Sequence, residues 1–576
     1  MFTAATLVRR AAVIAMFVLA MSGAAAPAQH PADLILVNGR IATQDKARPA
    51  AHAVAIKDGK FIAVGPDEDV LKHRGDRTTV IDAKGRAVVP GLIDSHLHAI
   101  RAGRFYNLEL RWDGVPTLKE ALARVRDQAK RTPKGQWVRV IGGWSAYQFE
   151  ERRLPTPREL TEAAPDTPVF VMFLYSRGFL NRSGVKGMGI TKETKAPAGG
   201  RYEVGEDGAV LVADPNPTIL YQAIAKLPEL GDADKVNSSR HFYRELNRFG
   251  LTGVVDAGGG GHQFARDYEA TKALAEKGDL SLRLSCFLFP QAPGKELEAF
   301  QGWNRDYKPG QDLAKGLVNG YTLEGGGETL VWAAGDFENF MAERPVILNT
   351  LEDRARLAEV MRHLVKNRWA FRLHATYDES ITKILDVLDE VNKETQLNGL
   401  RWLIDHAETA SPKTIRRIKA LGGGVAVQDR MAYAGELFKG RYGAEAAATA
   451  PPLRQLLDAG IPVGAGTDGT RVTSYNPWGS IAWMVTGKTL GGTQLYPKEN
   501  RLTRQEALRL YTVGSAWVSG EGPKGVIAPG RLSDLAVLSA DYFTVPEENI
   551  RGIEAVLTVV GGKVVYGAAD FEKLAA

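Results

Sequence analysis

Two histidines, His96 and His98, stand two residues apart at the end of the apolar run "VVPGLIDSHLH", and Asp94 comes two residues before the first. Side chains at positions i and i+2 of a β-strand point to the same side. The three polar groups would therefore share one face at the end of a strand. Imidazole and carboxylate groups on one face can bind a divalent metal ion. Two histidines alone are weak support, because polar residues often close a strand without binding anything.

Three later residues strengthen the metal hypothesis. His374 ends the apolar run "WAFRLHA", His406 ends "LRWLIDHA", and Asp468 ends "GIPVGAGTD". The spacing corresponds to about one and then about two strand-helix units, which assigns them to strands five, six and eight if His96 and His98 lie on strand one. Separate strands would then bring ligand-type side chains to one rim. Such donors suit zinc and similar ions, and a site left open to water is the catalytic arrangement.

The elements that must position these residues follow a strand-helix alternation over residues 91–520. Its strands are "SLRLSCFLF", "KGLVNGYT", "WAFRLHA", "LRWLIDHA", "GGGVAVQ" and "GIPVGAGTDG", and Thr503 and Glu506 form a capping box before the last helix. This pattern predicts an α/β fold, a (β/α)8 TIM-type barrel whose site lies at the carboxyl ends of the strands. Residues about 115–245 exceed one connection, so we expect an inserted subdomain over the barrel mouth.

The two ends of the chain share an alternating, strand-like pattern. Residues 29–90 and 521–576 are predicted to build one small β-sandwich domain around the barrel. Tight hairpin turns are predicted at two dipeptides, Asn38-Gly39 and Asp58-Gly59.

The N-terminus, residues 1–28, reads as a secretory signal with a short apolar core and cleavage after Ala28. The alternative is a membrane anchor that stays attached. Arg9 and Arg10 leave the export route open between the general secretory and twin-arginine systems. No other segment is apolar enough to cross a membrane, so we expect an exported periplasmic or extracellular protein without stable membrane insertion. The single cysteine, Cys286, cannot form an internal disulfide.

The formal net charge is +6, and no Lys/Arg-rich cluster resembles a nucleic-acid site. The expected partner is therefore a small molecule, and whether the protein forms a homo-oligomer stays open.

The chain resembles the amidohydrolase superfamily of metal-dependent hydrolases in four motifs and in its flanking β segments. The motifs are "PGLIDSHLH", "FRLHA", "WLIDHAET" and "GAGTDG". "RLPTPRELTEAAPDTPVFV" and "RLTRQEALRLYTVGSA" resemble the branch typified by N-substituted formamide deformylase, amidohydrolase family 3. The resemblance implies a divalent metal, expected to be zinc, and makes Asp468 the proton shuttle and His406 a second catalytic residue. It implies five metal-site residues, namely His96, His98, His374, His406 and Asp468.

One departure from the family pattern concerns the number of metals. Relatives often carry a bridging lysine on strand four, where this chain has Asn319 or Gly320. We therefore expect one tightly held metal, with His406 just outside its ligands. A second metal stays open if Glu324, or with less support Glu328, replaces the lysine.

A second departure concerns the substrate pocket. Relatives often have a histidine in the insertion where this chain has Ser176 or Arg177. Arg177, Trp144 and His262 are candidate substrate-binding residues, although ordinary packing would also explain Trp144 and a loop position His262.

These observations predict a hydrolase that cleaves a C–N, amide-type bond of a small molecule with metal-activated water. Two alternatives stay open. The same site could serve deamination or decarboxylation, or the protein could be a non-catalytic periplasmic binding protein.

Overall fold

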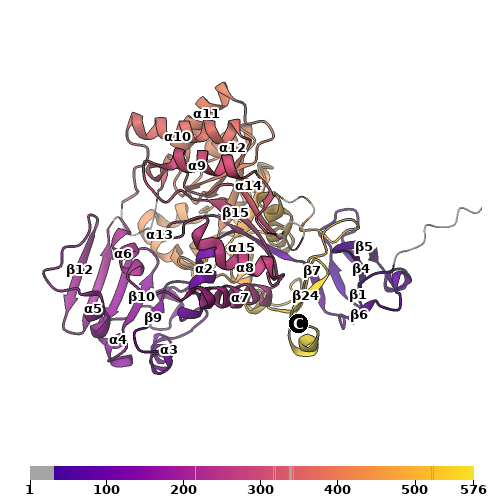
Figure 1. The fold of residues 1–576 in the computed structure, drawn as a ribbon, viewed down its shortest axis with the longest axis horizontal. Coiled ribbons are helices and arrows are strands. Elements are labelled where there is room, and N and C mark those ends of the chain that lie inside the picture. The colour runs from indigo at the N-terminus through magenta and orange to yellow at the C-terminus, as the bar shows by residue number, and fades with distance from the viewer. Residues whose placement is uncertain are drawn as a thin grey trace, which may run out of the picture.

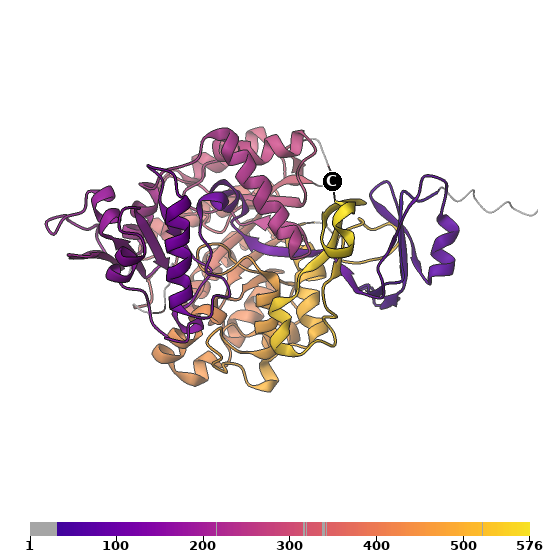
Figure 2. The ribbon, with the colours of Figure 1, turned by 90° about the horizontal axis from the view of Figure 1, so that it is seen from below.

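The structure, a computed structural model, describes residues 31–575 except 215, 315, 316, 318, 319, 337–339, 341, 342, 521 and 523. The expected signal and Asn319 lie outside these residues. An insertion of sheet and helices lies at one end of the molecule, the barrel in the middle and a β-sandwich at the other end (Figures 1 and 2). No helix in the described ranges combines the length and apolar character needed to span a membrane.

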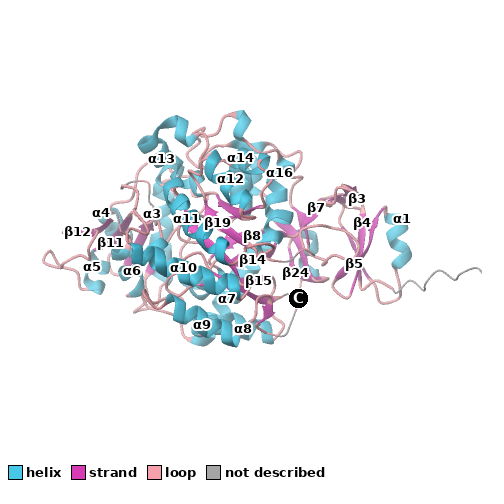
Figure 3. Ribbon diagram, turned by 90° about the horizontal axis from the view of Figure 1, so that it is seen from above, coloured by secondary structure: helices cyan, strands magenta, loops and turns pink. Residues whose placement is uncertain are grey.

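The middle part is a barrel of eight parallel, fully buried strands surrounded by helices (Figure 3). This confirms the predicted fold class. Its strands are, in chain and spatial order, β8 (Leu92–Leu97), β14 (Leu251–Asp256), β15 (Arg283–Leu288), β17 (Tyr321–Gly326), β18 (Ala370–Ala375), β19 (Trp402–His406), β20 (Gly424–Gln428) and β21 (Val463–Gly466). The helices of this part are α2 (Ala99–Phe105), α7 (Asp232–Arg248), α8 (Glu269–Glu276), α9 (Glu296–Asp306), α10 (Leu351–Lys366), α11 (Asp378–Glu394), α12 (Pro412–Ala420), α13 (Arg430–Ala447), α14 (Leu453–Asp458), α15 (Pro477–Thr486), α16 (Arg504–Arg509) and α17 (Ser515–Val518). The capping box predicted at Thr503 and Glu506 begins α16.

The barrel closes where its last strand, β21, meets its first, β8. The backbone N–H of Asp468 donates to the carbonyl of His96 at 2.7 Å, and the hydroxyl of Thr467 donates to Asp94 at 2.7 Å. A side chain at Gly466 would lie 2.4 Å from the nitrogen of His96, so only glycine fits this seam. Asp94 is therefore bound within the seam and does not join the two histidines at the mouth.

The insertion between α2 and α7 has its own sheet, in the order β12-β13-β11-β10-β9. Helix α7 begins inside the predicted limits of about 115–245 but extends to Arg248 and packs beside α2 and α8 of the barrel. A separate apolar core, including Phe170, Met172 and Leu211, holds the insertion together. Its elements are α3 (Leu118–Arg131), β9 (Val138–Val140), α4 (Pro157–Ala163), β10 (Val169–Phe173), β11 (Arg177–Asn181), α5 (Arg182–Met188), β12 (Gly200–Gly205), β13 (Gly208–Ala213) and α6 (Thr218–Ala225).

The β-sandwich uses both chain ends, as predicted, because β7 pairs with β2 on one side and with β22 on the other. Asp58 and Gly59 form the predicted hairpin between β4 and β5. Asn38-Gly39 does not, because β1 and β2 belong to different sheets. One sheet contains β1 (Leu34–Val37), β4 (Ala53–Lys57), β5 (Lys60–Gly65) and β6 (Thr79–Asp82); the other contains β2 (Arg40–Ala42), β3 (Ala50–Ala51), β7 (Ala87–Pro90), β22 (Leu535–Leu538), β23 (Ala555–Val560) and β24 (Lys563–Gly567).

Candidate metal centre

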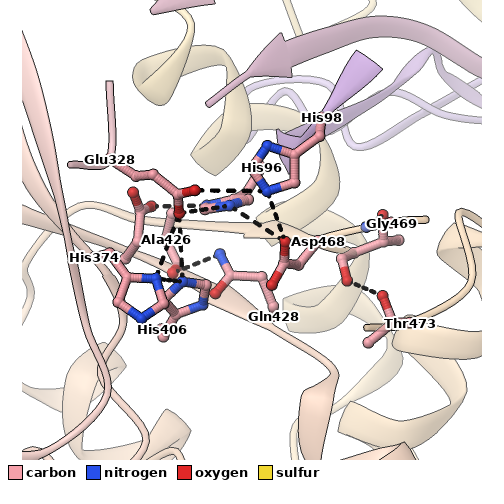
Figure 4. A network of polar contacts seen from close by, with 12 residues as sticks. His96, His98, Glu328, His374, His406, Ala426, Gln428, Asp468, Gly469 and Thr473 are labelled. Carbon is pink, nitrogen blue, oxygen red and sulfur yellow. Dashed lines mark hydrogen bonds and ion pairs between the residues drawn. The ribbon is translucent and has the colours of Figure 1, made fainter. Parts of the chain in front are cut away.

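Four imidazoles and two carboxylates meet at the carboxyl ends of the barrel strands (Figure 4). Each side chain sits at or just beyond the end of its strand, where the barrel opens toward the insertion. All six are buried. The residues are His96 of β8, His98 just after it, Glu328 after β17, His374 of β18, His406 at the end of β19, and Asp468 after β21.

Glu328 occupies the centre of this group, between the two histidines of β8 and the two of β18 and β19 (Figure 4). Its Oε2 lies 3.4 Å from Nε2 of His96, 3.5 Å from Nδ1 of His374 and 3.7 Å from Nε2 of His406. Burial raises the pKa of Glu328, but the charge of His98 and the close approach of the other three imidazoles hold it well below its usual range. The group at the centre is therefore a carboxylate anion.

Asp468 closes the other side of the cluster. Its Oδ1 lies 3.1 Å from Nε2 of His98 and 3.6 Å from Nε2 of His96, and its Oδ2 accepts a hydrogen bond from Arg430 at 3.0 Å. Burial raises the pKa of Asp468, but the hydrogen bond from His98 and the charges of the histidines lower the pKa by more than burial raises it. Asp468 is therefore ionised. Its φ of 59° lies in the left-handed region, an uncommon backbone strain that concentrates at functional sites.

The donor set fits a divalent metal ion. Two groups of ligand atoms, each within 4.8 Å of one another, share His96: one with Glu328 and His406, one with His98 and Asp468. Nε2 of His96 is buried without a hydrogen-bond partner in the described part of the chain. Leaving such a nitrogen unsatisfied costs about 1–3 kcal/mol. Imidazole and carboxylate ligands of this kind suit zinc.

Carboxylates and a carbonyl behind the cluster orient three of its rings. Nδ1 of His98 faces the carbonyl of Gly258, and Nε2 of His374 lies 3.2 Å from Asp336. Backbone N–H groups of residues 376 and 377 hold Asp336 in turn. These contacts leave Nε2 of His98 and Nδ1 of His374 directed at the cluster, a common arrangement around metal-binding histidines.

His96 is oriented by a buried ion pair. Arg372 donates to Asp405 at 2.8 and 2.5 Å, and Oδ1 of Asp405 lies 3.1 Å from Nδ1 of His96. Nη2 of Arg372 also lies 2.8 Å from Nδ1 of His96. For Nε2 to bind a metal, the proton of the neutral ring must be on Nδ1, where Asp405 can accept its hydrogen bond. Burial raises the pKa of Asp405, yet the charges of Arg372 and His96 bring it to about 2.

His406 is a neutral imidazole. Burial and the charges of Arg430 and His374 together lower its pKa to about 3. Nη2 of Arg430 lies 3.2 Å from its Nδ1, and Nδ1 of His374 lies 2.7 Å from its Nε2. Its Nε2 belongs to one of the two ligand groups. This position makes His406 a candidate ligand, and its predicted place just outside the ligands stays a prediction that metal-affinity measurements on a His406 variant would test.

The structure brings together all five predicted metal-site residues but not Glu324. The carboxylate of Glu324 accepts hydrogen bonds from Arg401 at 2.5 Å and from Thr322 at 2.8 Å, within and beside the barrel strands. Glu328, the less favoured candidate, enters the cluster because it stands beyond the end of β17. Gly320, one of the two positions considered for the missing lysine, precedes the first residue of that strand.

The three candidate substrate-binding residues do not line the cavity at the cluster. Trp144 is buried against Trp112 and Phe149 and donates to a backbone carbonyl. Arg177 begins β11 and donates to the carbonyl of its neighbour Ser176. His262 is buried 3.8 Å from Asp256.

A cavity of about 330 Å³ extends from the cluster toward the insertion. This volume is within the usual range for small-molecule sites. The barrel contributes His98, Glu328 and Asp468 to its wall, and the insertion contributes Tyr175 and Tyr221. The insertion therefore supplies part of the wall opposite the cluster.

Comparison with known proteins places these features in context. Residues 79–566 match the family model described as amidohydrolase family. N-substituted formamide deformylase from Arthrobacter pascens is 26% identical, with 93% of this chain and 98% of that protein covered. The putative amidohydrolase YtcJ from Bacillus subtilis is 25% identical over 92% and 98%.

Solved structures show the same fold. An uncharacterized metal-dependent hydrolase from Pyrococcus horikoshii has a TM-score of 0.63 at 21% identity, covering 89% of this chain and 99% of that one. Atrazine chlorohydrolase TrzN from Arthrobacter aurescens, complexed with zinc, has a TM-score of 0.52 at 17% identity, covering 93% and 95%.

Proposed function

The chain belongs to the amidohydrolase family, as a metal-dependent hydrolase acting on C–N bonds, and we propose that its reaction is the hydrolysis of an amide bond in a small molecule. The observation that carries the proposal is the cluster of four imidazoles and two carboxylates beside a cavity large enough for a small molecule. A substrate in that cavity would meet both the ligand atoms and Asp468, which also lines the wall.

Zinc is the proposed metal. The histidine and carboxylate donors suit it, and the similar chlorohydrolase structure contains it. When bound, such an ion lowers the pKa of a water molecule to about 7 and polarises a carbonyl group. His96, His98 and Asp468 would hold it, with His406, His374 and Glu328 completing the site.

Asp468 is the proposed proton carrier. Arg430 binds its Oδ2 at 3.0 Å, which leaves Oδ1 directed at the cluster and the cavity. As an ionised carboxylate, it can take a proton from the attacking water and deliver it to the leaving nitrogen. Nδ1 of neutral His406 accepts a hydrogen bond from Arg430, so the ring proton lies on Nε2, which faces the cluster and can donate to the reacting carbonyl.

The test combines metal analysis with a substrate screen. Purified protein should contain zinc and release amine and acid from N-formyl or N-acyl compounds, with turnover lost on chelation and restored by zinc. Release of ammonia from a ring or of carbon dioxide, without amide cleavage, would instead indicate deamination or decarboxylation. Tight ligand binding without any turnover by the zinc-loaded protein would indicate a binding protein.

We further propose that the protein is exported to the periplasm or beyond. The apolar core and the A-x-A motif ending at Ala28 support this proposal. Mass spectrometry of protein recovered from the periplasmic or culture fraction should find a chain that begins near residue 29. Recovery of a chain that retains Met1 would contradict it.

A further inference from the structure

Two arginines of the cavity wall have no acidic partner. Arg101, on α2, is 5% exposed; its Nη1 donates to the carbonyl of Gly260 at 3.2 Å, and its Nη2 is buried without a hydrogen-bond partner. Arg471, three residues after Asp468, is also buried and lines the same cavity. Across the described residues, neither guanidinium group forms an ion pair. Buried charges are usually paired, so an unneutralised pair indicates a ligand.

The two guanidinium groups act on one another and on two tyrosines. Burial lowers the pKa of Arg471, the charge of Arg101 lowers it further, and Tyr175 and Tyr221 raise it. Arginine nevertheless stays protonated in proteins. The rings of Tyr175 and Tyr221 lie 5.4 Å apart and both line the cavity. Two cations and two hydroxyl groups therefore converge on one part of the wall.

The other charged groups of the cavity have partners elsewhere. Glu109 lies 3.6 Å from Arg111, and Glu229 pairs with Arg104 and Lys235. Arg139 donates to the carbonyl of residue 228 at 2.7 Å. Burial raises the pKa of Glu109, and the charges of Arg111, Arg139, Arg471 and Arg101 lower it, so Glu109 offsets part of the positive charge of this wall. Among the described residues, no carboxylate forms a direct ion pair with Arg101 or Arg471, which leaves both guanidinium groups able to bind a ligand.

The cavity joins this basic region to the metal cluster. Arg101 follows His98 by one turn of helix, and Glu328 and the two arginines all influence the titration of Tyr221. Apolar side chains fill much of the remaining wall, including Phe105, Ile141, Ile224, Leu227, Phe289 and Trp332.

We propose that Arg101 and Arg471 bind a carboxylate of the substrate, so that the amide cleaved is an N-formyl or N-acyl amino acid with an apolar side chain. Guanidinium groups pair with carboxylates through parallel hydrogen bonds, and tyrosine hydroxyls can donate to the same oxygens. The inference rests on the proposed amide hydrolysis and specifies its substrate class. The metal cluster would face the amide carbonyl while the arginines hold the carboxylate.

The kinetic test compares N-formylphenylalanine with N-(2-phenylethyl)formamide, which has the same skeleton without the carboxylate. We expect kcat/KM of the zinc-loaded protein to be at least about 10-fold higher for the acid, the size of one charge-assisted contact. Arg101→Gln and Arg471→Gln should each reduce this ratio about 10-fold or more, mainly through KM. Equal kcat/KM values for the two compounds, or variants with an unchanged ratio, would overturn the inference.

Arg104→Gln is the matched control. Arg104 lies on the same helix as Arg101 and is equally buried, but it is paired with Asp267 at 3.2 Å and Glu229 at 3.3 Å. Its variant should melt at a lower temperature and keep the wild-type substrate ratio. A ratio that falls equally in this variant would show that general loss of packing, not carboxylate binding, explains the effect, and would overturn the inference.

A binding measurement separates this inference from the proposed function. In the zinc-loaded Asp468→Asn background, calorimetry should show that N-formylphenylalanine binds at least about 10-fold more tightly than the neutral formamide, and that Arg471→Gln removes the difference. Selective binding without turnover of either compound by the unmutated protein would overturn amide hydrolysis and support the carboxylate site. If the unmutated protein hydrolyses both compounds and the Asp468→Asn variant binds them equally tightly, amide hydrolysis is supported and the carboxylate site is overturned.

Discussion

The carboxylate of Asp405 lies 3.1 Å from Nδ1 of His96, so the residue just before one candidate ligand orients another on a different strand. Arg372 holds that carboxylate with two hydrogen bonds, and both members of the ion pair are fully buried. The direction of the His96 ring therefore depends on strands β18 and β19 as well as on its own.

Asp405→Asn should weaken zinc binding about 10- to 100-fold, the usual effect of removing a carboxylate behind a metal-binding histidine. Loss of the charge also leaves Arg372 buried without its partner, which should lower the free energy of unfolding by about 3–5 kcal/mol. Chelator competition measures the affinity, and circular dichroism verifies folding. Asp386→Asn, at an exposed pair with Arg417, is the control. Unchanged zinc affinity in folded Asp405→Asn would show that His96 needs no such orientation.

Asp468→Asn should reduce kcat by about 10²–10⁴-fold, because an amide cannot carry the proton from water to the leaving nitrogen. The fold should be retained, since Asn can still accept a hydrogen bond from Arg430 and occupy a ligand position. Steady-state kinetics at equal zinc content tests this. A variant with the wild-type kcat would remove Asp468 from the role of base.

Glu328→Gln should lower the metal content, because the structure places Glu328 within 3.7 Å of four imidazoles. Glu324→Gln is the matched control and should keep its metal while losing stability through the contact with Arg401. Elemental analysis would also show whether the chain holds the one metal expected from the missing lysine or two. Metal loss in Glu324→Gln alone would contradict this assignment.

In Glu506→Gln, the free energy of unfolding should fall less than in the wild-type protein when the pH is lowered into the acidic range. The hydrogen bond from Arg454, with help from Thr503, lowers the pKa of Glu506 to about 2, whereas an unfolded chain has a value near 4.3. The stabilisation is present above about pH 4.3 and is lost as pH falls toward 2. Because the side chain is 33% exposed, we expect only about 1 kcal/mol.

Thermal unfolding at pH 7 and at pH 3.5 measures this difference. The wild-type protein should have a higher melting temperature than Glu506→Gln at pH 7, and the difference between the two melting temperatures should be smaller at pH 3.5. Glu548→Gln, at an exposed position, should show neither effect. A gap that stays constant with pH would mean that the cap, not the charge, accounts for the stabilisation.

The sequence predicts the fold well because each barrel strand is a short apolar run and a polar residue marks the end of several. His374 and His406 could be placed in this way, as could the shared sheet of the chain ends. The hairpin at Asn38-Gly39 could not be excluded, since the dipeptide favours a tight turn in any sequence. In the structure Asn38 has a left-handed φ of 54° but Gly39 does not, whereas Asp58 and Gly59 are both left-handed, at 48° and 72°.

The central carboxylate was harder to predict. Glu324 and Glu328 both flank glycines near strand four, and only the end of β17 at Gly326 decides which one reaches the rim. Asp405 precedes His406 directly, and neighbours in a regular strand point to opposite faces. The φ of 75° at His406 breaks that alternation, and a single sequence does not reveal it.

Arg101 and Arg471 illustrate a further limit. Neither belongs to a motif, and their sequence neighbours give no sign of a missing acidic partner. The two arginines line one cavity only because the barrel brings α2 and the segment after β21 together.

The seam between β8 and β21 sets the time at which the metal centre can form. His96 is on one side of this seam and Asp468 is just beyond the other, joined by the hydrogen bond between their backbones. A chain that emerges N-terminus first, from the ribosome or from an export channel, presents the histidines of β8 long before Asp468, and the chain between them is most of the barrel. In either case the two ligand groups cannot both assemble until the last strand has docked. Zinc uptake should therefore be a late event in maturation and would report that the barrel has closed.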